Sequence, residues 1–173
     1  YQMPDGAKAL RFVHLDFAAF ELYILKRPGA EQDYDAETLE KAKLRFESMT
    51  AEEKAILKRN VMQGLPGSDD SFEFDTFLDL LAEYKHIGDK ELRENLYYFM
   101  QQVGPTATEV GVNMCIHPDD PPRPIMGLPR VLSTENDVAR LFEAYNDPAN
   151  GLTFCTGSFG VRPDNNLPQM VKR

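Results

Sequence analysis

One run of residues, VNMCIHPDDPPRP from Val112 to Pro124, constrains the fold more than any other part of the sequence. Its first half is predicted to be a buried strand, and its prolines predict that the second half is a rigid loop. Alternate residues of a strand point to opposite faces, so Val112, Met114 and Ile116 share an apolar face. Asn113, Cys115 and His117 share the other face, which can carry chemistry. His117 is the last residue on that face before the prolines end the strand.

A strand with one apolar and one polar face suits a β/α barrel, in which the active site lies at the C-terminal ends of the strands. A second strand is predicted within residues 151–158, GLTFCTGS, and Cys155 would end it as His117 ends the first. Their 38-residue separation is about one strand–loop–helix–loop repeat, because a βαβ unit takes roughly 30 residues or more. Adjacent parallel strands would bring this imidazole and this thiol together as half of a transition-metal site.

Three segments resemble the mannonate dehydratase family: GVNMCIHPDDPPRPIMGLPR (111–130), NGLTFCTGSFGVR (150–162) and LDFAAFELYILKRPG (15–29). The resemblance extends over essentially the whole chain. It implies an α/β fold of the TIM-type (β/α) barrel class and a lyase that dehydrates D-mannonate to 2-keto-3-deoxy-D-gluconate in glucuronate catabolism. It also implies a divalent metal, Mn²⁺ or Fe²⁺, because His117 and Cys155 fall on metal-ligand positions of the family.

The chain has 173 residues, whereas a closed eight-fold barrel typically takes about 250. We therefore expect residues 1–173 to be part of a single barrel domain, with the true N-terminus and the remaining strands missing. The family's further ligands and acid–base groups would then lie beyond residue 173, so the segment alone should be inactive. Residues 34–70 are highly charged and contain a capping box at Thr50 and Glu53, which predicts an extra helical insertion.

Polar residues beside the two motifs are candidates for substrate binding: Asp119, Asp120, Arg123, Ser158 and Arg162. Each aspartate could equally be a metal ligand, an acceptor that orients His117, a helix cap or a solvated loop residue. An arginine could bind the substrate carboxylate through a bidentate pair, although most arginines simply lie at the surface. Ser158 could bind a substrate hydroxyl or could stabilise the chain turn in which it lies.

The amino-acid composition limits the classes of molecule that this chain can bind. The net charge of −9 argues against nucleic-acid binding, which needs a basic face. No apolar run approaches the roughly 20 residues of a membrane span, so no membrane partner is expected. Two cysteines, both in predicted strands, are typical of a reduced, cytoplasmic enzyme rather than of a disulfide framework. We expect a small sugar acid as substrate and further copies of the chain as partners in a homo-oligomer.

Two other functions remain open at this point. A metal-dependent sugar isomerase or epimerase on the same barrel would also need enolisation beside a bound cation, but would need no arginine for a carboxylate. A non-catalytic assembly module could use the charged helices within residues 35–63 for contacts. The pairing of His117 with Cys155 argues against an assembly module, because such a module does not need a pair of metal-binding side chains.

Overall fold

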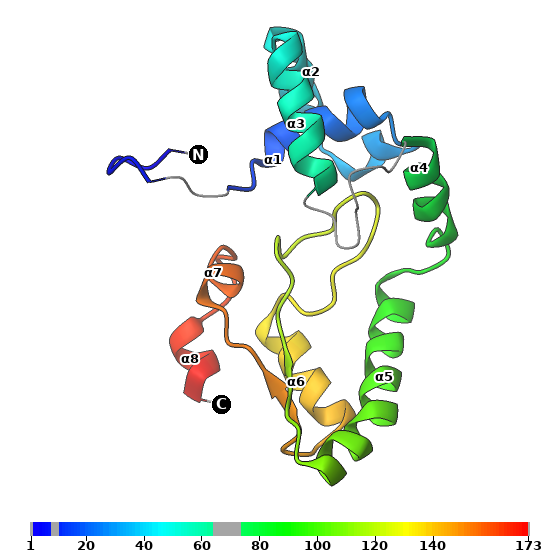
Figure 1. The fold of residues 1–173 in the computed structure, drawn as a ribbon, viewed down its shortest axis with the longest axis vertical. Helices are drawn as coiled ribbons and strands as arrows, with labels where there is room; N and C mark the ends of the chain where they lie inside the picture. Colours follow the sequence, from blue (N-terminus) through cyan, green and yellow to red (C-terminus); the bar gives the residue numbers. More distant parts are fainter. Residues whose placement is uncertain (1, 8–10, 64–73, 173) are drawn as a thin grey trace. The chain divides into compact units, whose positions relative to one another are not determined.

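The computed structural model describes residues 2–7, 11–63 and 74–172. The chain divides into two compact units, unit 1 from Tyr1 to Tyr84 and unit 2 from Lys85 to Arg173. The elements described in unit 1 are helices, whereas unit 2 combines helices with a two-stranded parallel sheet (Figure 1). The predicted α/β class is therefore confirmed as a mostly helical structure with a small parallel sheet, and the barrel stays a prediction.

The helices of unit 1 are α1 (His14–Ala19), the π-helical turn η1 (Phe20–Leu25), the 3₁₀ turn η2 (Ala30–Asp33), α2 (Ala36–Ser48), α3 (Ala51–Gln63) and α4 (Phe74–Glu83). The predicted capping box is confirmed: the Glu53 amide donates to Thr50 Oγ1 at 3.2 Å, and the Thr50 amide donates to the Glu53 carboxylate at 2.8 Å. Thus α2 and α3 fill most of the charged segment 34–70. Residues 64–70 lie outside the described residues, and the segment's status as an insertion stays a prediction.

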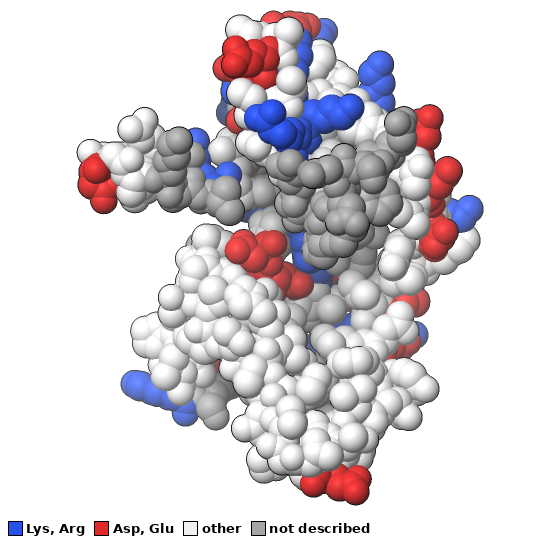
Figure 2. All heavy atoms as spheres, viewed as in Figure 1, with Lys and Arg blue, Asp and Glu red and all other residues white. Residues whose placement is uncertain are grey.

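Small side chains let the helices of unit 1 approach closely. Ala18 and Ala19 of α1 are fully buried against Ala42 of α2. Beside them the ring of Tyr23 stacks on that of Phe46, with 5.2 Å between ring centroids. The opposite surface is charged, and Figure 2 shows acidic and basic side chains interspersed over α2 and α3. α2 therefore buries Ala42 and leaves its charged face to solvent, whereas the described residues of α3 are exposed or half-buried.

The elements of unit 2 are α5 (Asp89–Val110), β1 (Met114–Ile116), α6 (Glu135–Ala144), β2 (Asn150–Leu152), α7 (Thr156–Phe159) and α8 (Leu167–Lys172). α5 continues through Pro105, and Asp89 lies within its first turn. Gly88 is the N-cap, and its amide donates to the Glu91 carboxylate at 3.1 Å.

The two strands form a β–α–β unit around α6. β1 pairs in parallel with β2, with Met114 opposite Asn150 and Ile116 opposite Leu152. Gly151 permits this pairing, because a Cβ atom there would lie 2.9 Å from the Met114 carbonyl oxygen. The Asn150 side-chain amide donates to the Leu141 and Tyr145 carbonyls, both at 2.9 Å, and so fixes the end of α6 to the start of β2.

The apolar face of the sheet was predicted to be buried, but Met114 and Ile116 are half-buried and Val112 is 51% exposed. This face packs on one cluster shared by α5, α6 and the loop between β1 and α6, whose members are Met100, Leu132 and Leu141, with Met114, Ile116 and Leu152 against them. Cys115 and His117, of opposite parity, are exposed. Figure 1 shows α6 beside the strands. Alternation along β1 therefore separates the core from the face that carries the chemistry.

Both strands are shorter than the sequence predicts. Pairing continues one step past β2, where the Thr153 amide donates to the Ile116 carbonyl at 2.9 Å. The chain then turns, with the Cys155 amide donating to the Thr153 carbonyl at 2.8 Å, so Cys155 is the N-cap of α7 and not a strand residue.

Among the described residues, no helix combines the length and the apolar character that crossing a membrane requires.

Candidate metal centre

His117 directly follows β1, and its imidazole is exposed. Its Nδ1 lies 2.7 Å from the Pro118 carbonyl oxygen. A carbonyl oxygen only accepts, so Nδ1 carries a proton in this hydrogen bond. The same contact, followed by the one with Cys155, raises the pKa of His117. The start of the proline-rich loop thus sets both the tautomer and the orientation of the ring.

Cys155 lies where β2 gives way to α7, and its surroundings favour the thiolate. The Ser158 hydroxyl donates to Cys155 Sγ at 3.3 Å. That hydroxyl, the Ser158 amide, the His117 ring and the Gly157 amide together lower the pKa of the Cys155 thiol to about 7. Ser158 is only 1% exposed, so packing holds the donor in place. A substantial fraction of the thiol is therefore ionised at neutral pH.

The two candidate ligands meet as the sequence predicts, since a hydrogen bond between them contributes to both pKa shifts. A neutral imidazole nitrogen and a thiolate suit a divalent transition metal. The donor set therefore fits a metal ion as two ligands of a larger set. Within the described part of the chain, no three His, Cys, Asp or Glu residues gather closely enough to complete such a site.

The two candidate aspartates differ in their surroundings. Asp119 Oδ2 accepts from the Leu132 amide and from the Ser133 hydroxyl, both at 2.7 Å, which closes the loop between β1 and α6. Asp120 is exposed, and its charge adds to the rise in the pKa of His117. The group that accepts the His117 N–H is thus the Pro118 carbonyl, which corrects the alternative that an aspartate orients the ring.

The two candidate arginines also differ. Arg162 makes a bidentate pair with Asp164, at 2.9 and 2.7 Å, and its Nη1 donates to the Pro122 carbonyl at 3.0 Å. Arg123 lies exposed on the loop after His117, and the described residues offer its guanidinium no ion pair. Of the two, Arg123 has its donors available.

Sequence analysis missed a second polar cluster, in unit 1. Glu21 is 1% exposed, and its carboxylate pairs with Arg27 and accepts from the Tyr34 hydroxyl. Arg27 also pairs with Asp33. The available signal was Glu21 inside the otherwise apolar run from 17 to 25, since a buried carboxylate requires partners.

Comparison with known proteins decides the family. The sequence model described as D-mannonate dehydratase (UxuA) matches residues 1–173. The chain belongs to the D-mannonate dehydratase family. It is 50% identical over 173 residues to the mannonate dehydratase of Marinomonas sp. (strain MWYL1), covering 100% of this chain and 44% of that protein. It is 44% identical over 172 residues to that of Saccharophagus degradans (strain 2-40 / ATCC 43961 / DSM 17024), covering 99% and 43%.

A solved member of the D-mannonate dehydratase family is similar in structure. The crystal structure of mannonate dehydratase from Streptococcus suis serotype 2 aligns with a TM-score of 0.54 and 37% sequence identity, over 62% of this chain and 31% of that one. The chain spans less than half the length of the curated relatives it matches. The resemblance seen in the sequence is thereby confirmed.

Proposed function

We propose that the complete protein containing this chain is a metal-dependent lyase that dehydrates D-mannonate to 2-keto-3-deoxy-D-gluconate. Family membership supports the reaction. The observation that carries the chemistry is the contact between His117, which follows β1, and Cys155, which lies in the turn between β2 and α7. This chain would supply two metal ligands, and the other ligands and the acid–base groups would come from outside it.

The proposed ion is Mn²⁺ or Fe²⁺, held by His117 Nε2 and Cys155 Sγ. When bound, such a cation acts as a Lewis acid on the oxygens of a sugar acid. It thereby makes the proton on the carbon next to the carboxylate easier to remove. The protein residues prepare the ligands. The Pro118 carbonyl holds the imidazole proton on Nδ1, and Ser158 keeps the thiol ionised.

The substrate would lie over the loop that follows His117. We propose that Arg123 binds the carboxylate, because its guanidinium is exposed and a bidentate pair suits a planar carboxylate. Asp120 is the exposed acid on the same loop and is proposed to contact a substrate hydroxyl. Asp119, Ser158 and Arg162 direct their polar atoms to groups within the chain, so we propose that they act by holding the loop and the thiol.

The surrounding architecture is proposed to be a TIM-type barrel, of which β1, α6 and β2 form one repeat. A two-stranded parallel sheet is rarely stable alone, because parallel sheets are normally covered on both faces. We also propose a cytoplasmic homo-oligomer. Both cysteines are free, in keeping with a reducing compartment.

The deciding experiment measures bound metal and D-mannonate dehydration in the complete protein, its His117→Ala variant and its Cys155→Ala variant. Metal content is determined after extensive dialysis, and the keto-acid product is followed directly. Loss of both metal and turnover in each variant is expected, since two ligands would be removed. Full metal content and turnover in either variant would show that the substituted residue is not a metal ligand.

Matched controls come from the same chain. His86→Ala removes an exposed histidine, and Cys115→Ala removes the exposed thiol of β1. Both should keep metal and activity. The comparisons favour the dehydratase over a sugar isomerase or an assembly module, because the relatives are mannonate dehydratases. Turnover of a neutral sugar in place of D-mannonate would reverse that preference.

A further inference from the structure

The turn between α7 and α8 makes hydrogen bonds to both segments that carry the candidate ligands, the loop after His117 and the turn at Cys155. Its central residue is Asn165, whose side-chain Nδ2 donates to the Ser133 carbonyl at 3.0 Å and to the Phe159 carbonyl at 3.1 Å. Its Oδ1 accepts from the Glu135 amide at 3.3 Å. One side chain therefore bridges the start of α6 and the end of α7 with three hydrogen bonds.

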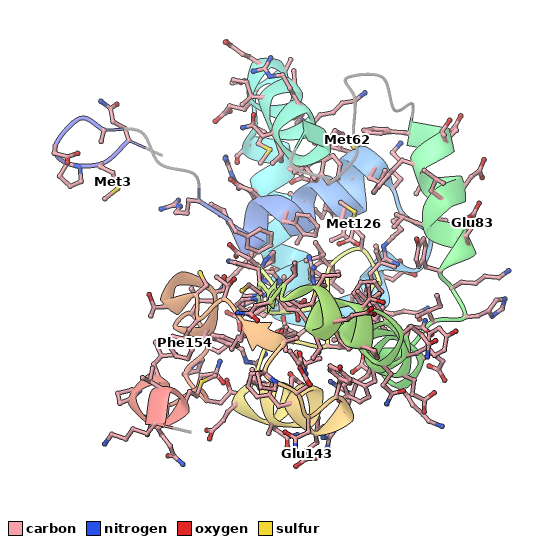
Figure 3. All side chains as sticks on the ribbon, turned by 60° about the horizontal axis from the view of Figure 1, so that its bottom comes forward. Met3, Met62, Glu83, Met126, Glu143 and Phe154 are labelled. Carbon is pink, nitrogen blue, oxygen red and sulfur yellow. The ribbon has the colours of Figure 1, made fainter. Side chains whose placement is uncertain are left out.

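The two segments that Asn165 bridges are each connected to one of the candidate ligands, His117 or Cys155. Ser133 donates its hydroxyl to Asp119, two residues after His117, so the Ser133 contact bears on the His117 loop. Phe159 belongs to α7, and its amide donates to the Cys155 carbonyl at 3.0 Å. Figure 3 shows Phe154 between β2 and α7, and its ring packs on that of Phe159 with 5.7 Å between centroids. The Phe159 contact thus bears on the Cys155 turn.

We propose that Asn165 is a positioning residue that fixes the His117 loop and the Cys155 turn relative to each other and so sets the geometry of the two ligands. This inference rests on the proposed function for its metal, but the contacts themselves do not depend on it. Arg162 makes a parallel link from the same turn, because its Nη1 donates to the Pro122 carbonyl. Asn165 is the stronger candidate, since its side chain reaches both ligand segments.

An amide is required at this position. Two carbonyl oxygens need donors and one backbone amide needs an acceptor, which is the complement that a carboxamide offers. Asn165→Asp preserves size and acceptor but removes both donors and places a carboxylate against two carbonyls. Its matched control is Asn166→Asp. The Asn166 side-chain oxygen accepts from the Gln169 amide at 3.2 Å, and an aspartate retains that role.

The test uses the complete protein and two readouts. In the metal-free form, alkylation of Cys155 by iodoacetamide is followed by peptide mass spectrometry across pH, which reports the midpoint of thiol ionisation. In the cobalt(II)-loaded form, the thiolate-to-cobalt absorption band and the cobalt Kd report the geometry of the pair. Asn165→Asp should raise the alkylation midpoint, weaken the band and raise the Kd roughly 10-fold, as loss of a supporting hydrogen bond typically does.

The outcomes separate this inference from the proposed function. Unchanged readouts in Asn165→Asp, or equal changes in Asn166→Asp, would overturn the positioning role. If the parent protein shows no thiolate-to-cobalt band, the proposed metal site fails, and the alkylation midpoint alone decides about Asn165. If Asn165→Asp does not fold, Asn165→Ala, which brings no carboxylate, takes its place. Unfolding of both would show a role in stability only and would also overturn the proposal.

Discussion

The polar cluster of unit 1 and the ligand pair of unit 2 handle polar groups in opposite ways. Glu21 is buried, and its carboxylate is bound by Arg27 and Tyr34 within the same unit. His117 is exposed, and its Nδ1 donates to the Pro118 carbonyl, so Nε2 is the nitrogen that can bind a ligand once it is unprotonated. The first arrangement satisfies its charge internally, whereas the second orients donors for a ligand from outside.

This difference separates stability from function. A buried carboxylate without its charge partner is costly, so the unit 1 cluster should be sensitive to substitution through folding. An exposed pair contributes little to folding, so substitutions there should act through metal affinity. Burial of the Tyr34 phenol, followed by its hydrogen bond to the Glu21 carboxylate, raises the pKa of Tyr34. The phenol therefore stays protonated and acts as a donor.

The largest effect is expected from Glu21→Gln. This change keeps the size of the side chain but removes the charge that pairs with Arg27, and it should lower the free energy of unfolding by about 3 kcal/mol. Denaturant unfolding, with hydrogen exchange of the α1 and α2 amides, would measure it. Glu37→Gln, which removes an exposed carboxylate paired with Lys41, is the control and should change nothing measurable. Equal effects in both variants would contradict the proposed difference between a buried and an exposed carboxylate.

The next effect is a loss of metal affinity on acidification. Binding requires an unprotonated His117 Nε2 and a Cys155 thiolate. Because the pKa of His117 is raised and that of Cys155 lies at about 7, protons compete for both groups once the pH falls below neutrality. Lowering the pH from about 7 to about 6 should raise the cobalt Kd roughly 10-fold or more. A Kd that does not change with pH over this range would contradict the ligand assignment.

A smaller effect is expected from Ser158→Ala. The hydroxyl donates to Cys155 Sγ and is the first cause of the lowered pKa, so its loss should raise the thiol pKa above about 7. Metal affinity at neutral pH should fall roughly 10-fold, while both ligands remain. The pH profile of Cys155 alkylation measures the shift. An unchanged midpoint would show that backbone donors alone stabilise the thiolate.

The smallest effect is expected from Tyr34→Phe. It removes one of two partners of Glu21, and Arg27 stays in place. The free energy of unfolding should fall by about 1 kcal/mol, the usual contribution of one hydrogen bond. Metal binding should not change, since the residue lies in the unit 1 cluster. A loss of metal affinity here would show that the two regions are coupled.

Much of the fold follows from local patterns. The capping box at Thr50 and Glu53 is confirmed, and Met114 and Ile116 pack against the core as half-buried residues. The strand ends were wrong, because a two-residue turn at Thr153 ends the pairing before Cys155. Such an end depends on hydrogen bonds that apolar periodicity does not encode.

By itself, the sequence determined the family, the pairing of His117 with Cys155 and the polar face of β1, because strand alternation and motif spacing are local properties of the chain. Only the tertiary structure decided which groups surround them: Pro118 on the imidazole, Ser158 on the thiol, and Asn165 across the two segments. It also decided that Glu21 is a buried charge. Such hydrogen bonds depend on where separate segments meet, and no periodicity in the chain records that.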